Sequence, residues 1–367
     1  MKVLHIINGE HYSGAERVQD LLVQKLPKYN IDVYLACIKP NKFLKRCECD
    51  ISKIVEFPMS SRMDFSQAIK ISSYVKKNDI NLIHTHTPRT ALIGYIASKV
   101  SGLPLVHHVH SPTMRDTENN RKNSINASIE KYVMKRSSSI ITVSNSLKQY
   151  LLNIGLSDNN ISVVLNGVKS LKLLPSRDIP HTEWTIGVIA LFRPRKGIEI
   201  LLESLSKIVV DGNQHIKLRA IGEFESEDYK KEIINLTMTL GLSEYIHWVG
   251  FSNDIERELG MIDIFILPSL YGEGLPMVIL EAMANGVPVI STNVEGVPEA
   301  IPSDEYGIVV EPGNPESLST AIQQLIESEG MWSGIRKRAY KHQLEYLSAD
   351  AMAKGVADVY TTVFSAQ

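Results

Sequence analysis

The chain has 367 residues, of which 44% are apolar and 22% charged, and its formal net charge is −2. This length is too great for one typical domain and predicts two, and the composition is that of a packed globular protein rather than a disordered one. No apolar run approaches the roughly 18 residues of a membrane-spanning helix, which argues against a transmembrane protein.

The first half of the chain alternates short apolar runs with amphipathic stretches, which predicts an α/β unit with a parallel sheet. The predicted strands cover residues 3–7, 32–38, 82–86, 105–110, 140–143 and 161–165. The predicted helices cover residues 17–26, 65–78, 91–100 and 145–152. The run that starts at Met1 is too short and too soon interrupted for a signal peptide, so we interpret it as a buried strand.

A segment without periodicity, residues 169–184, contains Pro175 and Pro180 and is interpreted as a linker between two domains. The second unit has predicted strands at residues 185–191, 217–221, 246–249, 264–267, 287–291 and 307–310. Its helices are expected at residues 197–210, 229–240, 276–285 and 315–327, and residues 333–364 are expected to be helical throughout. Two such units in tandem leave a cleft, and ligands of open α/β sheets bind at the carboxyl ends of the strands.

The segment from Glu273 to Glu281 carries two carboxylates eight residues apart, with a Gly-Leu-Pro turn after the first. Pro276 suits the first helical position, where its missing N–H would have no partner. Glu273 is therefore expected in the loop before a helix and Glu281 within that helix. Since the N–H groups of a helix start attract anions, the segment offers donors for a phosphate and two carboxylates for hydroxyl pairs. This combination indicates a nucleotide-sugar site, and the simpler interpretation is a capped surface helix.

Two other loops follow predicted strands. Residues 191–197 contain Arg193, Arg195 and Lys196, and fixed cations there would stabilise the charge that grows on a departing nucleoside diphosphate without a metal. Gly14 lies where the first strand leads into a helix, so its backbone can approach a ligand closely and the helix start faces a phosphate. Each loop also has a simpler interpretation as an ordinary turn.

Histidines and cysteines raise the question of a metal. Five histidines lie on two predicted strands: His84, His86, His107, His108 and His110. Imidazoles bind zinc well, but the sequence positions no carboxylate or cysteine beside them, so no metal site is predicted. The odd number of thiols (Cys37, Cys47 and Cys49) indicates free cysteines in a reducing compartment.

The run from Pro268 to Ile290 joins Pro-Ser, Glu-Gly-Leu-Pro and Glu-Ala-Met-Ala-Asn-Gly-Val-Pro-Val in one segment. It resembles the donor-site signature of the family-4 retaining glycosyltransferases, which are also called group 1. The resemblance covers nearly the full chain and is sharp from about residue 187 to 312. It implies a GT-B fold, in which two Rossmann-like domains face across a cleft and the final helix crosses back to the first domain. The implied domains are residues 1–175, with a helix at about 348–367, and residues 176–347.

The resemblance also implies roles for individual residues in the donor domain. Lys196, with Arg193 or Arg195, would hold the diphosphate. Glu273 would bind sugar hydroxyls, near the amides of Gly274 and Leu275, and Glu281 would bind the ribose 2′- and 3′-hydroxyls. The position that usually holds the family's phosphate arginine is Leu191 here, so the choice between the two arginines stays open.

In the first domain, His110 matches a histidine that contacts the donor hexose, and His86 ends an adjacent strand beside the sugar. His107 and His108 are expected to be packing or solvent-exposed residues. The loop around Gly14 looks like the family's Gly-Gly-Ala-Glu-Arg element, with Ser13 in place of the first glycine or acting as a helix cap. Residues 111–122 look like an acceptor loop. The implied catalytic residues are therefore His110, Lys196 and Glu273, with no metal and no cofactor.

Charge is distributed unevenly along the chain. Residues 1–180 hold 25 Lys and Arg against 14 Asp and Glu, a net of +11, and residues 181–367 hold 14 against 27, a net of −13. A basic first half implies an anionic partner, and without a nucleic-acid motif this favours a membrane surface or a pyrophosphate-linked lipid acceptor. A solvated basic surface is the alternative.

Together these features predict a retaining, metal-independent hexosyltransferase that uses a nucleoside-diphosphate sugar, with a UDP-sugar favoured and GDP-mannose second. The expected acceptor is a lipid-linked saccharide of surface polysaccharide or lipopolysaccharide synthesis. The expected location is the cytoplasm, either free or peripheral on the inner face of the cell membrane. A GT-B sugar-nucleotide epimerase and a non-catalytic glycosyltransferase-like binding subunit are the alternatives.

Overall fold

The computed structural model describes residues 1–115, 120–180, 182–210, 212 and 215–365. The chain divides into two compact units. Unit 1 comprises Met1–Val168 and Ser348–Gln367, and unit 2 comprises Lys169–Leu347. Among the described residues of 169–183, none lies in a helix or a strand, which agrees with a linker, although these residues are counted with unit 2.

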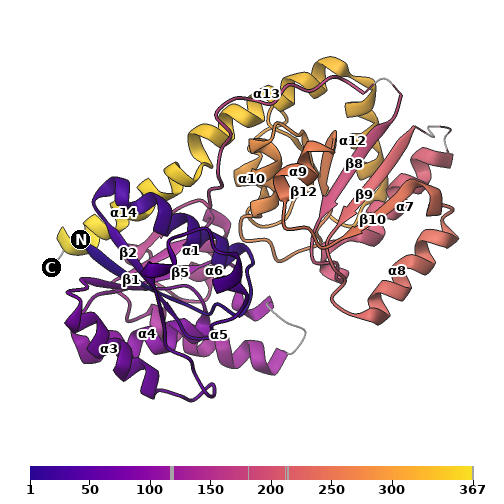
Figure 1. Ribbon diagram of the computed structural model, residues 1–367. Helices are drawn as coiled ribbons and strands as arrows, with labels where there is room; N and C mark the ends of the chain where they lie inside the picture. The colour runs from indigo at the N-terminus through magenta and orange to yellow at the C-terminus, as the bar shows by residue number, and fades with distance from the viewer. Residues whose placement is uncertain (116–119, 181, 211, 213–214, 366–367) are drawn as a thin grey trace. The chain divides into compact units, whose positions relative to one another are not determined.

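Unit 1 is built on a seven-stranded parallel sheet in the order β3-β2-β1-β4-β5-β6-β7 (Figure 1). Its strands are β1 (Lys2–Ile7), β2 (Asp32–Cys37), β3 (Ile54–Glu56), β4 (Leu82–Thr85), β5 (Leu105–Val109), β6 (Ser139–Thr142) and β7 (Ile161–Val163). Its helices are α1 (Gly14–Lys25), α2 (Lys42–Arg46), α3 (Ser66–Lys77), α4 (Pro88–Ser101), α5 (Asn120–Met134), α6 (Asn145–Asn153) and α14 (Ala349–Ser365). Helices on both faces bury the central strands, which is why those strands are nearly continuous apolar runs.

Unit 2 is built on a six-stranded parallel sheet in the order β10-β9-β8-β11-β12-β13. Its strands are β8 (Trp184–Ile189), β9 (Ile216–Ile221), β10 (Ile246–Gly250), β11 (Ile264–Leu267), β12 (Val289–Thr292) and β13 (Ile308–Val310). Its helices are α7 (Ile198–Val210), α8 (Glu227–Thr239), α9 (Ile255–Gly260), α10 (Met277–Ala284), α11 (Val297–Ala300), α12 (Pro315–Glu327) and α13 (Glu329–Tyr346).

Both sheets confirm the predicted fold class of two Rossmann-like units. The expectation that residues 333–364 form one continuous helix is wrong, because the helix ends at Tyr346 and α14 begins at Ala349. The Ser348 side chain accepts a hydrogen bond from the Ala351 N–H, and this cap starts the new helix. α14 packs against α1, so the final helix does return to the first unit, as predicted.

Each sheet reverses its strand order at one point, and this is where open α/β sheets bind ligands. In unit 1 the reversal lies between β1 and β4, and in unit 2 it lies between β8 and β11. The loops that follow β8 and β11 contain Lys196 and Glu273, respectively. The topology therefore places the predicted cationic loop and the first carboxylate at the same switch point.

Candidate active site

An ion pair links the two loops at the switch point of unit 2. The Lys196 ammonium contacts the Glu273 carboxylate, although 77 residues separate them in the chain. The Ser269 hydroxyl donates to Glu273 Oε1 at 2.6 Å. Gly197 makes this approach possible, because its φ is +65° and a Cβ there would lie 2.1 Å from the carbonyl oxygen of Pro268.

Burial by itself raises the pKa of the Glu273 carboxyl, but the Lys196 ammonium and the Ser269 hydroxyl more than offset this and hold the pKa below its usual value. Burial lowers the pKa of the Lys196 ammonium, against the opposing effect of Glu273. The site therefore holds a buried carboxylate beside a desolvated cation. Such a cation interacts strongly with an incoming anion because little water screens it.

The two arginines of the cationic loop have different partners. Arg195 Nη1 donates to the backbone carbonyl oxygens of Tyr271 at 3.2 Å and Gly272 at 3.0 Å. It therefore braces the loop that carries Glu273. Arg193 Nη1 lies 3.3 Å from Glu225 Oε1 in a partly exposed ion pair. Leu191, at the position of the family's usual arginine, has a 45% exposed side chain.

Glu295 is a residue of this site that the sequence did not reveal. Its carboxylate oxygen Oε2 accepts the backbone N–H groups of Gly272 at 2.8 Å and Glu273 at 3.0 Å. Its φ is +29°, a conformation that costs a residue with a side chain on the order of 1–3 kcal/mol. No sequence pattern signals this contact, because 22 residues separate Glu295 from Glu273.

The second carboxylate lies on the helix that follows the loop. Glu281 is buried within α10, and Glu273 precedes the helix, so the predicted secondary structure of the segment is confirmed. Pro276 is the cap of α10 rather than its first helical residue, because its ψ of 115° is extended. Gly274 and Leu275 are buried in the turn between Glu273 and α10. The carbonyl oxygen of Gly274 packs closely on Gly296, because a Cβ added to Gly296 would lie 1.8 Å from that oxygen.

In unit 1, α1 begins at Gly14 rather than at the predicted Arg17, and Ser13 is its cap, which is one of the two roles left open for it. The carboxylate of Glu16 accepts the Ser13 N–H at 3.3 Å and the Ser13 hydroxyl at 2.6 Å. A carboxylate from the chain itself thus lies at this helix start. The phosphate contact predicted for Gly14 stays a prediction.

A chain of hydrogen bonds connects the histidines of β1, β4 and β5 to the terminal helix. His110 Nε2 lies 3.1 Å from His86 Nδ1, and His86 Nε2 lies 3.1 Å from His5 Nδ1. The Tyr360 hydroxyl on α14 lies 2.8 Å from His5 Nε2 and 2.5 Å from His84 Nδ1. His110 is partly exposed, and the other members are buried.

Burial lowers the pKa of His5 and of His110 to about 3. It also lowers the pKa of His84, His86 and His108 well below the usual value. These rings are therefore neutral at pH 7, and each carries one N–H. The sequence interpretation missed His5 and Tyr360, which looked like ordinary core residues of a strand and a helix.

His107 lies on the opposite face of β5, because side chains alternate along a strand. Its Nε2 lies 3.0 Å from Glu130 Oε1 on α5, and its Nδ1 lies 2.8 Å from the Thr85 hydroxyl. The Thr113 hydroxyl donates to the same Glu130 carboxylate. The predicted acceptor loop, residues 111–122, contains residues 116–119, which lie outside the described part of the chain, and its last residues belong to α5.

Two overlapping sets of histidines are compact enough to be considered for a metal: His5, His84 and His86, and His86, His108 and His110. Within each set the candidate ligand atoms lie within 4.8 Å of one another. However, the nitrogens of His5 and His86 are already joined by hydrogen bonds, and neither set includes a carboxylate. The expected absence of a metal stays a prediction.

The cysteines carry no chemistry of this kind. Cys37, Cys47 and Cys49 are free thiols, as predicted. Burial raises the pKa of Cys37 to about 12 and raises the pKa of the other two, so the reactive thiolate form is disfavoured.

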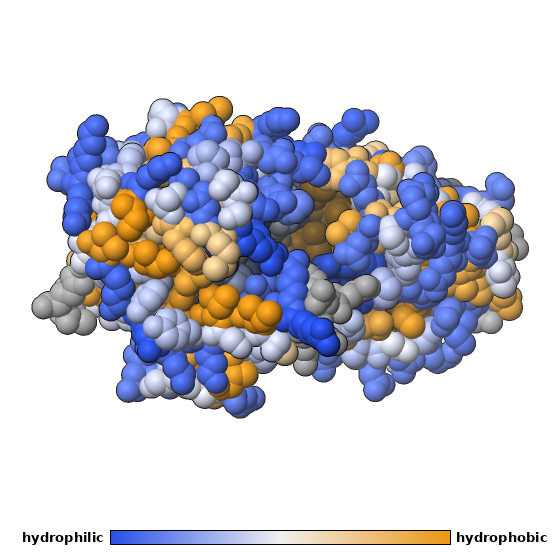
Figure 2. All heavy atoms as spheres, turned by 90° about the horizontal axis from the view of Figure 1, so that it is seen from below, coloured by the Kyte–Doolittle hydropathy of each residue, from blue (hydrophilic) through white to orange (hydrophobic). Residues whose placement is uncertain are grey.

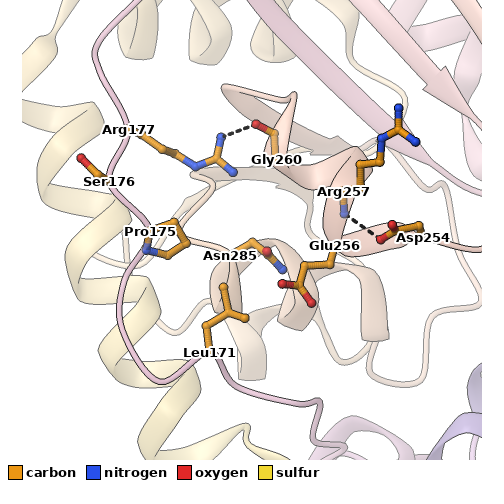
Figure 3. Close-up of a pocket in the computed structure, with 9 residues that line it drawn as sticks. All are labelled: Leu171, Pro175, Ser176, Arg177, Asp254, Glu256, Arg257, Gly260 and Asn285. Carbon is orange, nitrogen blue, oxygen red and sulfur yellow. Dashed lines mark hydrogen bonds between the residues drawn. The ribbon is translucent and has the colours of Figure 1, made fainter. Parts of the chain in front are cut away.

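A pocket of about 540 Å³ lies elsewhere in unit 2, beside the linker and α9 (Figure 3). Arg177 in its wall donates to the carbonyl oxygens at the end of α9, namely those of Leu259 at 2.7 Å and Ile262 at 2.8 Å. None of the residues that line it is among the predicted site residues. Arg177 is occupied in anchoring the linker, and the pocket contains none of the predicted site residues, so we place the chemistry at the switch point instead.

Two family models match the chain. The model for group 1 glycosyl transferases matches residues 171–342, and the model for glycosyltransferase family 4 matches residues 12–170. No helix in the described part of the chain combines the length and apolar character needed to cross a membrane.

Named relatives and solved structures agree with the models. The UDP-Gal:alpha-D-GlcNAc-diphosphoundecaprenol alpha-1,3-galactosyltransferase of Escherichia coli is 24% identical and is aligned over 90% of this chain and 89% of its own. The capsular polysaccharide biosynthesis glycosyltransferase CapM of Staphylococcus aureus is 24% identical over 98% of this chain and 97% of its own. The crystal structure of Anabaena HepE in complex with UDP-glucose shares the fold, with a TM-score of 0.84 and 20% identity over 99% of this chain and 100% of HepE.

Proposed function

Because the chain belongs to the group 1, family-4 glycosyltransferases, we propose that it transfers a hexose with retention from a nucleoside-diphosphate sugar to a hydroxyl of a lipid-linked saccharide. We favour a UDP-sugar as donor and GDP-mannose second, in the synthesis of a surface polysaccharide or lipopolysaccharide. The names of the Escherichia coli and Staphylococcus aureus relatives and the UDP-glucose bound to HepE support this choice. The observation that carries the proposal is the ion pair between the half-buried Lys196 and the buried Glu273 at the switch point of unit 2.

In the proposed reaction, the diphosphate of the donor takes Lys196 as its partner. The carboxylate of Glu273, still held by Ser269, then accepts hydroxyls of the hexose, and Glu281 accepts the ribose hydroxyls. Arg193 supplies a second cation, because Arg195 is engaged with the loop carbonyl oxygens. The ion pair compensates two charges that are largely withdrawn from water, each of which would be costly alone.

The chemical step breaks the bond between the anomeric carbon and the phosphate oxygen and forms a bond from the acceptor oxygen on the same face. The acceptor proton moves to the leaving phosphate, so no covalent nucleophile is needed. His110 contacts the donor hexose. Lys196 stabilises the charge that develops on the leaving group, so we propose that no metal is required.

The test is the rate of nucleotide release from UDP-sugars with Lys196→Ala, compared with Lys207→Ala as a matched control. Lys207 pairs with Glu316 at an exposed position on α7 and lies outside the site. Loss of one preorganised group that stabilises transition-state charge typically costs about 100- to 1,000-fold in kcat. A change within a few-fold for Lys196→Ala would show that Lys196 does not hold the diphosphate.

Donor identity is tested by thermal shift with UDP- and GDP-sugars. A donor at 100 times its Kd stabilises the folded state by about 2.7 kcal/mol, and stabilisation by GDP-mannose alone would reassign the donor. Product analysis with and without a lipid-linked acceptor separates transfer from epimerisation, since an epimerase converts the UDP-sugar with no acceptor. Undiminished transfer in EDTA is the expected result for a metal-independent enzyme.

A face of α5 supports a peripheral position at an anionic membrane. Ile125 is 62% exposed and Tyr132 is 47% exposed on this helix. The exposed basic residues Arg121, Lys135 and Arg136 lie at its two ends, and the Arg136 guanidinium lies 3.7 Å from the centre of the Tyr132 ring. Figure 2 views the molecule from the side on which α3, α4 and α5 lie in Figure 1, and hydrophobic side chains gather there among hydrophilic ones.

Sedimentation with vesicles tests this position. Each basic residue near an anionic surface contributes about 1 kcal/mol, so Lys135→Glu is expected to weaken binding to anionic vesicles by about 10-fold or more. Lys231→Glu, at an exposed position on α8 of unit 2, is the matched control. Equal binding of the unaltered protein to neutral and anionic vesicles would refute the membrane proposal.

A further inference from the structure

Glu295 has a backbone conformation that glutamate rarely adopts. Among the described residues other than glycine, a positive φ occurs at Asn30, Asp79 and Glu295. Asparagine and aspartate tolerate this region because their short side chains form local hydrogen bonds, an advantage that the longer glutamate side chain lacks. The backbone of Glu295, with φ +29°, therefore needs compensation from its surroundings, and strain of this kind is concentrated at functional sites.

The side chain of Glu295 supplies that compensation by binding two consecutive backbone N–H groups. Its Oε2 accepts from the Gly272 N–H at 2.8 Å and from the Glu273 N–H at 3.0 Å. Gly272 has a φ of +83°, and a left-handed residue in a turn directs successive N–H groups toward one side, where they attract an anion. The Glu295 carboxylate therefore occupies an anion-binding turn that Gly272 and Glu273 form.

The segment of residues 292–296 contacts the same loop at two further points. The Thr292 hydroxyl donates to the Ser269 carbonyl oxygen. The Gly296 N–H donates to the Glu273 carbonyl oxygen at 3.3 Å. Both polar atoms of the Glu273 backbone are thus bound by this one segment, which fixes the point from which the Glu273 side chain extends.

A charge of the opposite sign holds the other polar atoms of the loop. Arg195 donates to the carbonyl oxygens of Tyr271 and Gly272, whereas Glu295 accepts from the N–H groups. Hydrogen bonds in which one partner is charged are stronger than those between neutral groups. The loop is therefore held by charged side chains from two different segments before any donor binds.

We propose that Glu295 is a positioning residue, whose carboxylate fills the anion-binding turn and thereby keeps the Glu273 carboxylate beside Lys196 and aligned with the donor hexose. The alignment with the hexose rests on the proposed function, whereas the placement of the loop does not. Without Glu295 the two N–H groups would be open to a small anion from solution, and this makes the proposal testable.

The first experiment compares two variants of the full chain in hexose transfer from a UDP-sugar. Glu295→Gly removes the carboxylate and also relieves the strain, so a loss of activity cannot come from strain. A misplaced reactive group costs up to about 100-fold, so we expect kcat/KM to fall by about 10- to 100-fold. Glu295→Gln keeps an oxygen that accepts both N–H groups, and its kcat/KM should stay within about 5-fold of the unaltered protein.

The binding of UDP separates positioning from a general disturbance of unit 2. UDP lacks the hexose that Glu273 contacts in the proposed reaction, so its Kd in Glu295→Gly should change by less than about 2-fold in calorimetry. A parallel loss of UDP affinity and kcat/KM would show a general disturbance and would overturn the proposal.

The second experiment restores the missing carboxylate from solution. Propionate is the removed side chain with one hydrogen added, so it fits the space and the chemistry that Glu295→Gly leaves. Propionate should raise kcat/KM of this variant and move its urea unfolding, followed by tryptophan fluorescence, to higher urea than sodium chloride does at equal ionic strength. The unaltered protein and Glu295→Gln should respond equally to the two salts.

Asp79→Gly is the matched control for removal of a strained acidic residue. Asp79 has a φ of +55° and lies in unit 1, in the turn between α3 and β4. This variant should keep the kcat/KM of the unaltered protein and should show no preference for propionate over chloride.

The urea measurement distinguishes this proposal from the proposed function. If the unaltered protein transferred no hexose, the proposed function would fail, but propionate should still stabilise Glu295→Gly more than chloride does. Equal stabilisation by the two salts would overturn the assignment of the anion-binding turn. In an active protein, kcat/KM of Glu295→Gly within about 2-fold of the unaltered value, or of Glu295→Gln as low as that of Glu295→Gly, would overturn the positioning role.

Discussion

The buried histidines should make unit 1 far more sensitive to mild acid than unit 2. His5, His84, His86 and His108 are fully buried or nearly so, and burial lowers the pKa of each below its ordinary 6.5. Their folded-state pKa is depressed, so the unfolded chain binds protons that the folded unit does not. The free energy of unfolding of unit 1 is therefore at its full value above pH 6.5. It decreases as the pH falls from 6.5 toward about 3.

The magnitude follows from linkage. One pH unit below the unfolded pKa, each buried imidazole that stays neutral lowers the free energy of unfolding by about 1.4 kcal/mol. Four of them lower it by about 6 kcal/mol at pH 5.5. That is comparable with the whole stability of a typical domain, about 5–15 kcal/mol. In unit 2, by contrast, His215 and His247 are exposed, and His342 is half-buried, with a pKa that burial lowers. Ordinary carboxylate protonation lies mainly below this pH range.

The placement of the tryptophans provides the assay. All three, Trp184, Trp248 and Trp332, belong to unit 2, so their fluorescence reports that unit, while circular dichroism reports both. In urea titrations between pH 7.5 and 5.0, we expect the dichroism transition to move to lower urea and separate from the fluorescence transition.

The control is His108→Phe, which removes one imidazole that forms no hydrogen bond with the described residues. This variant should reduce the pH dependence of the unfolding free energy of unit 1 by one proton, which is about 1.4 kcal/mol per pH unit. If the two transitions stayed coincident down to pH 5.0, the histidines would be protonated in the folded protein and the reasoning would be refuted.

Three other predictions concern unit 2. Glu295→Gly and Glu295→Ala both remove the carboxylate that accepts from Gly272 and Glu273, but only glycine relieves the strain at φ +29°. In urea unfolding followed by tryptophan fluorescence, we therefore expect the glycine variant to be more stable than the alanine variant by about 1 kcal/mol. Equal stability of the two variants would argue against strain. Ser269→Ala removes one support of the Glu273 carboxylate and should lower kcat/KM about 10-fold at pH 7.5, whereas a change below 2-fold would contradict that support. Leu191→Arg, at an exposed position, should change the free energy of unfolding by no more than about 0.5 kcal/mol and should tighten UDP binding measured by calorimetry. Weaker binding would show that the introduced guanidinium does not reach the diphosphate.

The sheets were predictable because buried parallel strands are apolar runs, but short or exposed elements were not. β3 has only three residues at the sheet edge, and its side chains are partly or fully exposed, so it shows no run to recognise. α5 was missed because its exposed Ile125 and Tyr132 disturb the amphipathic pattern. The break between α13 and α14 contains neither glycine nor proline, and Ser348 was its only local signal.

The donor segment was predictable as far as its chemistry is local. The setting of Glu273 before α10 and Glu281 within it follows from a turn and a helix start. Its contacts with Lys196 and Glu295 depend on how distant strands are ordered, and no local pattern contains that order. Tyr360 is the extreme case, because it contacts a histidine 355 positions away.

That separation has a consequence for the order in which the protein acquires its structure during synthesis. The ribosome makes all 179 residues from Lys169 to Leu347 before it reaches α14, so unit 2 is fully synthesised while unit 1 still lacks a helix. Until then the sheet of unit 1 leaves uncovered the face that α14 later packs on, where His5 and His84 contact the Tyr360 hydroxyl in the folded protein. Unit 1, although it begins first, therefore finishes folding last, and a premature stop shortly after residue 347 would damage the opposite end of the chain.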